Sequence, residues 1–285
     1  MDPSERGVIL VNVLLFVAIA SGIVMLMIRA GDAALDRGLR MREAARAQAI
    51  LHGGELSAIV ALRRDGLVGP DSDNLAEPWA VLGETAAPIE GGTFSLAIAD
   101  AQARFNVNML ATGDPAARDT LARIVAALAL PPALAVQAAE TLRLAGPVAD
   151  LRPLRRVAIA PETRARLAGL ITALPYPTRI NANTASEDLL AILLGDPVAA
   201  HALVARRARQ GYLTPADFSD ENMAVPGPIG FTSDAYWVRT RVTISATTQQ
   251  RTSLLIRARH ADGTVSVRAV ARWRGAAAPD QAPPL

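Results

Sequence analysis

Four acidic residues late in the chain have side chains that could bind a hard cation. Asp217, Asp220, Glu221 and Asp234 supply carboxylate oxygens, which suit calcium if the loop folds them together. The acidic residues do not alternate densely, however, and the Pro-Gly-Pro sequence at 226–228 interrupts the segment. A candidate calcium site at these four positions therefore stands beside the alternative of a solvated acidic loop.

The other residue types that carry chemistry argue against an enzyme. His52, His201 and His260 are isolated from one another and lack metal-ligand spacing. Cysteine is absent, which excludes disulfides, zinc–thiolate sites and a cysteine nucleophile. The sequence contains no Gly-x-Ser-x-Gly, phosphate loop or dinucleotide fingerprint. We therefore predict that the protein is not an enzyme.

The segment Ile180–Arg209 is similar to helix-hairpin-helix motifs, some of which bind DNA. Its Arg206-Arg207-Ala-Arg209 sequence is cationic, but the turn between the two expected helices contains Asp196 and Pro197. Asp196 would repel phosphate, and Pro197 has no backbone N–H to offer it. Protein contact or plain packing is thus favoured, while a membrane-anchored DNA-binding protein of competence type remains the alternative function.

An apolar run from Val8 to Ile28, broken only by Asn12 and Ser21, is long enough to span a bilayer of about 30 Å. A short polar leader ending in Gly7 precedes it, and no good signal-peptidase context follows it. This layout resembles a type IV prepilin signal, in which a peptidase cuts after the glycine. Gly7 and Val8 would then flank the cleaved bond, and a plain signal anchor is the alternative.

Charge gives little guidance to partners or orientation. The net charge is +2, and the pI of about 9.6 arises because all 29 basic residues are arginine. We therefore expect no nucleic-acid partner. Arginines after the apolar run would place the bulk of the chain in the cytoplasm by the positive-inside tendency, whereas the prepilin-type leader places it in the periplasm.

The remaining chain alternates between helical and extended patterns. The N-terminal helix should continue to about Arg64, with a kink at Gly53-Gly54. Proline and glycine then predict a loop over 65–92, followed by a strand at 93–100. Five helices are expected within 114–209, at 114–130, 133–144, 161–173, 185–194 and 197–209.

Three alternating segments near the C-terminus, at 236–245, 250–259 and 264–273, predict strands. Asp262-Gly263 indicates a hairpin between the last two. The strand at 93–100 can find partners only among these, so the helical block is an insertion into an α+β domain. Residues 276–285 are rich in proline and alanine and are expected to be disordered.

Several segments together resemble the minor pseudopilin K family of the type II secretion system (general secretion pathway protein K). They are the leader junction at 6–8, Ile98–Asn108, Leu174–Leu190 and Ser233–Val238. The resemblance extends over nearly the whole chain, from about Arg6 to Trp273. It implies an α+β, pilin-like fold, with a long N-terminal transmembrane helix on an antiparallel sheet and a large inserted all-α domain containing helix-hairpin-helix-like segments.

The implied domains are a leader at 1–7, a transmembrane half-helix at 8–28, a pilin-like domain at 29–108 and 218–275, a helical insert at 109–217, and the tail at 276–285.

The implied partners are the I- and J-type minor pseudopilins and the prepilin peptidase, with secreted substrates or the outer-membrane secretin as further contacts. The protein would be anchored in the inner membrane with its bulk in the periplasm. Its role would be to initiate the pseudopilus at the tip and aid export of folded proteins. The family also supports calcium as the one candidate cofactor.

Asn12 provides information about the position of this subunit in a pseudopilus fibre. Most pilins carry glutamate at the fifth mature position, where it is proposed to pair with the N-terminal amine of a neighbouring subunit. After cleavage behind Gly7, that fifth residue is Asn12. Asn12 is uncharged and cannot neutralise an ammonium group in lipid, where an unpaired charge costs several kcal/mol. The resemblance thus implies a subunit that needs no partner above it; the alternative is a tolerated polar residue in an anchor.

Overall fold

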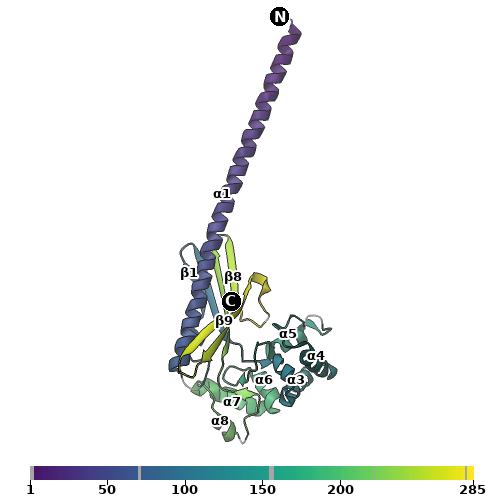
Figure 1. Ribbon diagram of the computed structural model, residues 1–285, viewed down its shortest axis with the longest axis vertical. Coiled ribbons are helices and arrows are strands. Elements are labelled where there is room, and N and C mark those ends of the chain that lie inside the picture. Colours follow the sequence, from purple (N-terminus) through teal and green to yellow (C-terminus); the bar gives the residue numbers. More distant parts are fainter. Residues whose placement is uncertain (1–2, 70–71, 154–156, 222, 280) are drawn as a thin grey trace.

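The N-terminal part of the chain is one long helix in this computed structural model, which describes residues 3–69, 72–153, 157–221, 223–279 and 281–285, with side chains from residue 12 onward except that of residue 276. Helix α1 comprises Pro3–Val68 and has 66 residues, so it is about 100 Å long. Its N-terminal half projects away from the body of the molecule (Figure 1).

The projecting half of α1 could anchor the protein in a membrane. Among the residues that the structure describes, α1 is the one helix long and apolar enough to cross a bilayer, and the apolar segment is entirely exposed. Side chains such as Phe16 and Leu26 remain 73% and 68% exposed. An exposed apolar surface of this extent is unusual for a soluble monomer and suits lipid contact.

An antiparallel sheet of five strands packs against the C-terminal half of α1, in the order β1-β2-β7-β8-β9 (Figure 1). The strands are β1 (Glu84–Ile89), β2 (Gly92–Asp100), β7 (Ala235–Ile244), β8 (Thr247–Arg259) and β9 (Val265–Arg274). Strand β2 pairs with β7 in one continuous register from Gly92↔Ile244 to Asp100↔Tyr236. This pairing confirms that the helical block is inserted between strands of an α+β fold.

Small residues let α1 lie close to the sheet. Ala47 and Ala58 are completely buried in the contact, together with Leu51 and Leu62. A Cβ added to Gly54 would lie 2.9 Å from the ring of Phe94, so glycine is required there for close packing. At Gly53-Gly54, where the sequence predicts a weak point or kink, the helix continues without interruption, and Gly54 serves the helix–sheet contact.

The inserted region between β2 and β7 forms its own apolar core. Its elements are β3 (Phe105–Asn106), η1 (Val107–Thr112), α3 (Pro115–Ala127), α4 (Ala133–Ala145), α5 (Pro161–Leu170), β4 (Ile171–Thr172), β5 (Ile180–Asn181), α6 (Glu187–Leu194), α7 (Pro197–Gln210), α8 (Pro215–Asp220) and β6 (Ile229–Gly230). Completely buried side chains such as Leu110, Ile124 and Leu203 fill the space between these helices. Two short parallel pairs, β3 with β4 and β5 with β6, connect distant segments.

Three segments differ from the sequence prediction. The segment 65–92 is predicted to be loop, but it includes the end of α1, the short helix α2 (Pro78–Val81) and the edge strand β1. The helix predicted over 161–173 ends at Leu170, because Ile171–Thr172 pair with β3 as strand β4. The tail is not free of contacts either: Arg104 Nη1 donates to the Gln281 carbonyl at 2.9 Å, and Arg239 Nη1 donates to that of Pro283 at 3.0 Å. These two bonds, together with burial of Gln281, hold the final residues against the molecule, where we had predicted disorder.

Candidate functional site

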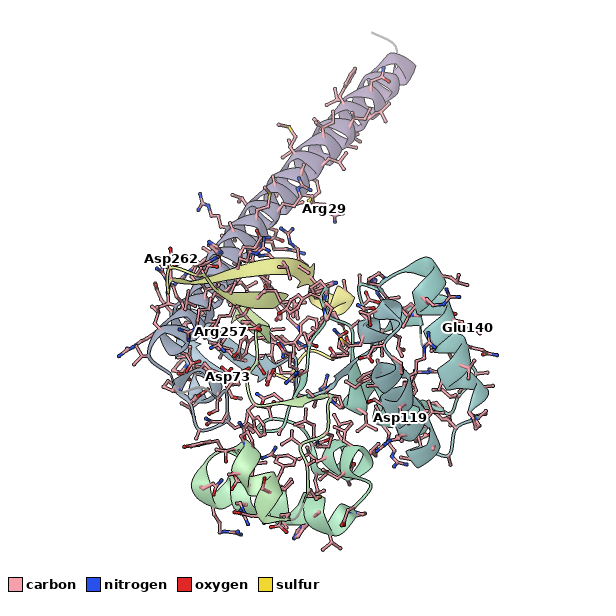
Figure 2. The ribbon with its side chains drawn as sticks, turned by 60° about the horizontal axis from the view of Figure 1, so that its bottom comes forward. Arg29, Asp73, Asp119, Glu140, Arg257 and Asp262 are labelled. Carbon is pink, nitrogen blue, oxygen red and sulfur yellow. The ribbon has the colours of Figure 1, made fainter. Side chains whose placement is uncertain are left out.

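Five segments of the chain meet where the sheet joins the helical insert, and each contributes polar residues. They are the end of α1 with the loop after it, the end of β2, β5 with the turn after it, the start of β7 with the residues just before it, and the end of β8. Figure 2 shows Asp73 of the loop beside Arg257 of β8, at the base of the sheet. We call these polar groups the junction network; its members are Asp65, Asp73, Glu77, Asp100, Asn181, Thr184, Ser233, Tyr236 and Arg257.

Asp100 is the main acceptor of the junction network. Its Oδ2 accepts hydrogen bonds from Ser233 Oγ at 2.6 Å, Asn181 Nδ2 at 2.9 Å and Thr184 Oγ1 at 2.5 Å. Its Oδ1 accepts one from the Gln102 backbone N–H at 2.7 Å. Burial raises the pKa of Asp100, although these bonds act in the opposite direction. The last residue of β2 is thereby tied to the helical insert and to the start of β7.

Arg257 is the cation of the junction network. Its guanidinium forms ion pairs with Asp65, at 2.7 Å, and with Asp73, and all three side chains are at least nine-tenths buried. It also lies over the ring of Tyr236, with its central carbon 5.2 Å from the ring centroid. The Tyr236 hydroxyl donates to Asp73 Oδ1 at 2.7 Å. One arginine on β8 thus connects the end of α1, the following loop and β7.

The carboxylates of Asp65, Asp73 and Glu77 have oxygen atoms within 4.8 Å of one another. Two of the three are already paired with Arg257, and Glu77 Oε2 accepts from Trp79 Nε1 at 2.7 Å. A divalent ion would have to displace the guanidinium and these hydrogen bonds. The group therefore fits an internal arginine counter-ion and does not fit a metal.

Glu77 should make stability depend on pH. Burial raises the pKa of Glu77 from 4.5 to about 7, against the hydrogen bonds from Asn74 and Trp79. Because the folded state holds this proton more tightly, its stabilising contribution is complete below pH 4.5 and is lost as the pH rises through about 7. We expect Glu77→Gln to flatten the fall in unfolding free energy over this range, measured by urea denaturation at several pH values. The exposed Glu84→Gln is the control, and equal slopes for both variants would refute the assignment.

The structure brings three of the four predicted calcium ligands together and leaves the fourth apart. Asp217, Asp220 and Glu221 surround Arg206, with N–O distances of 3.2, 2.7 and 3.2 Å. Asp234 lies instead just before β7, where its backbone N–H donates to Gln102 Oε1 at 2.7 Å. The three gathered carboxylates already have a cation, so they do not fit calcium as they stand.

The turn of the helix-hairpin-helix-like segment offers little to a phosphate. Asp196 Oδ1 accepts from the backbone N–H groups of Val198 and Ala199, at 2.9 and 3.1 Å. These donors at the start of α7 are therefore occupied. Arg207 is directed inward and donates to the carbonyls of Ala182 and Ala185. The geometry favours packing over DNA binding.

The histidines remain apart, as their spacing in the sequence predicts. His201 Nδ1 lies 3.0 Å from Glu187 Oε1, and His260 Nε2 lies 2.8 Å from Ser266 Oγ; both are exposed pairs. His52 is exposed on α1. The hydrogen bonds of the described residues connect none of the three to the junction network, and we assign them no chemical role.

Comparisons with known proteins agree with this architecture. A profile described as type II secretion system (T2SS), protein K, matches residues 180–236. The type II secretion system protein K of Pseudomonas aeruginosa is 28% identical over 257 residues, covering 77% of each chain. Together with the fold, these matches support the identification of the chain as a protein K of the type II secretion system. It is accordingly a minor pseudopilin, and this family is a structural component of the secretion system with no known enzymatic activity.

A solved structure shares the fold. The crystal structure of the GspK-GspI-GspJ complex from the enterotoxigenic Escherichia coli type 2 secretion system contains a chain that is 21% identical. The match has a TM-score of 0.63 and covers 84% of this chain and 99% of that chain. The pilin-like fold predicted from the sequence is thus confirmed.

The segment that carries the family match coincides with the junction. Residues 180–236 begin in β5 and end in β7, so they include Asn181, Ser233 and Tyr236 of the junction network. They also include Arg206 and its three carboxylates. The matched segment therefore contains several of the residues that attach the helical insert to the sheet.

The predicted processing residues lie on α1. Gly7 and Val8 have helical backbone, and their side chains are outside the described part of the structure. Asn12 is exposed on the same helix. Cleavage between Gly7 and Val8, and the assembly role of Asn12, remain predictions.

Sequence reasoning missed Asp65, Asp73, Glu77 and Arg257. The first three lie in or beside a segment that we predicted to be loop, where acidic residues normally signify solvent exposure. A signal was present in the close spacing of Glu77 and Trp79, because a buried indole N–H requires an acceptor. Arg257 gave no such signal, because Arg257 and Arg259 alternate with Ala258 at the end of a predicted strand, and such alternation is typical of a solvent-exposed face.

Proposed function

We propose that this minor pseudopilin occupies the tip of the pseudopilus, where it initiates assembly and aids export of folded proteins across the outer membrane. The inner membrane would hold the N-terminal half of α1, and the rest of the chain would lie in the periplasm. The observation that carries this proposal is the uneven distribution of mass along the molecule. The bulky helical insert lies at the end of the molecule opposite the N-terminus of α1 (Figure 1).

That shape favours an end position in a fibre. Pilin-type helices stack along the fibre axis, and a large domain at the far end of the sheet would obstruct a further subunit above it. Asn12 supports the same position, because an uncharged side chain cannot neutralise the N-terminal amine of a subunit above. The two features lie at opposite ends of the molecule and are independent of each other.

The proposed partners are minor pseudopilins of the I and J types. The structurally similar chain was crystallised with GspI and GspJ. In this chain, α1 carries exposed apolar side chains just beyond the membrane-spanning segment: Leu35, Leu39 and Met41 are 70%, 57% and 72% exposed. Exposed apolar residues on a helix are suited to packing against neighbouring helices.

Co-purification tests the proposed partners. We expect Leu39→Arg to reduce recovery of I- and J-type subunits with the tagged full-length chain several-fold, because a charge would then lie in the helix–helix contact. Leu144→Arg on α4 is the matched control, since Leu144 is also exposed, at 76%, but belongs to the helical insert. Equal recovery with both variants would contradict packing through this part of α1.

A further inference from the structure

We propose that Arg206 is a built-in cation that replaces a divalent metal in the helical insert, so that its acidic surface is held together without calcium. This inference concerns the insert alone and does not depend on the proposed position in the fibre. It follows from the disagreement between the predicted calcium ligands and the geometry that the structure shows.

The guanidinium of Arg206 lies among three carboxylates. Its Nη1 is 3.2 Å from Asp217 Oδ1 and 2.7 Å from Asp220 Oδ2, and its Nη2 is 3.2 Å from Glu221 Oε1. Arg206 is on α7, whereas the carboxylates are on α8 and the residue after it. The arginine side chain is only 24% exposed, so the cation is held between the two helices.

Asp217 fixes the position of this cluster. Its Oδ2 accepts from the Thr214 backbone N–H at 2.7 Å and from Thr214 Oγ1 at 2.8 Å, which caps the start of α8. Its Oδ1 accepts from Gln210 Nε2 at 3.1 Å as well as from Arg206. Burial raises the pKa of Asp217, but these bonds outweigh it and lower the pKa to about 2. The carboxylate is therefore charged and directed toward Arg206.

Calcium requires six to eight oxygen ligands, which it commonly completes with water. With Arg206 present, a guanidinium fills the space between the carboxylates, and both Asp217 oxygens are occupied. Without Arg206, the three carboxylates would face a common space, and no other cation pairs with them in the described part of the structure. They could then act together as calcium ligands, which the Arg206 side chain prevents in the native protein.

Thermal unfolding of the full-length chain in detergent, in chelator and in millimolar calcium chloride, tests the inference. We expect the wild-type midpoint to be the same in both conditions. Arg206→Ala should unfold several degrees lower in chelator and regain most of that loss in calcium. Arg206→Lys keeps a positive charge and should not respond to calcium. Arg209→Ala, which removes an exposed arginine from the same helix, is the control and should show neither effect.

Two results would overturn the proposal. A wild-type midpoint that falls in chelator would mean that the native protein already uses a metal. An Arg206→Ala variant that is destabilised or unfolded to the same degree with and without calcium would mean that the carboxylates do not form a cation site. Calcium rescue of Arg206→Ala together with an unresponsive Arg206→Lys variant would support it.

Discussion

Replacing Arg257 by methionine is expected to lower the free energy of unfolding by about 3–5 kcal/mol, because it leaves two buried carboxylates without their cation. Asp65 and Asp73 are 6% and 4% exposed at the side chain, so water cannot take over the role of the guanidinium. Burial already raises the pKa of Asp65 while Arg257 is present. The variant should therefore be least stable at high pH and should recover part of the loss as the carboxylates are protonated.

Urea denaturation of the full-length chain in detergent measures this effect. Arg46→Met is the matched control, because Arg46 pairs with Glu90 at 2.8 Å but the two side chains are 45% and 90% exposed. An exposed pair of this kind contributes about 0–1 kcal/mol. If both variants lost the same small amount of unfolding free energy, Arg257 would not be a structural cation and the junction network would contribute little to stability.

The second large effect is expected for Asn181→Asp, an almost isosteric change at a completely buried position. Asn181 Nδ2 has three acceptors within hydrogen-bonding distance: Asp100 Oδ2 at 2.9 Å, Ser233 Oγ at 3.0 Å and the Asp73 carbonyl at 2.9 Å. Aspartate would place a second carboxylate against Asp100 and remove the amide N–H donors. We expect a loss of about 3–5 kcal/mol at neutral pH, as for an uncompensated buried charge.

The sign of the pH dependence distinguishes charge repulsion from a simple packing defect. Two adjacent carboxylates raise each other's pKa, so the folded variant holds a proton that the unfolded chain releases. The loss should therefore be largest at high pH and should shrink as the pH falls toward the usual carboxyl pKa of about 3.9. Gln137→Glu on the exposed side of α4 is the control. A loss that does not change with pH would contradict the role assigned to Asn181.

The helices of the insert could be predicted closely because residues next to each helix end determine where the helix begins. Asp114 accepts from the Ala116 N–H at 2.9 Å with Pro115 at the first helical position, and Ser186 accepts from Leu189 N–H at 3.2 Å. The hairpin between β8 and β9 was equally local, since Gly263 has φ of +80° as an Asp-Gly turn requires. Such signals depend on neighbouring residues only.

Contacts between distant residues could not be predicted from the same signals. Asp73 and Arg257 are 184 positions apart, and nothing near either residue indicates the other. Strand β1 was missed because it is an edge strand with a register shift and contains Pro88. The acidic residues near 220 were recognised as potential ligands, but the arginine that neutralises them comes from another helix.

The sequence of the mature N-terminus tests most directly whether this chain is processed as a pseudopilin. The protein should be extracted from the membranes of cells that contain its own prepilin peptidase, then sequenced from its N-terminus and weighed by mass spectrometry. A Gly7→Arg variant, which should remain uncleaved, is the control. We predict a mature chain that begins at Val8, with or without a methyl group on its amine. A chain that keeps Met1 and the seven-residue leader under the same conditions would contradict the account.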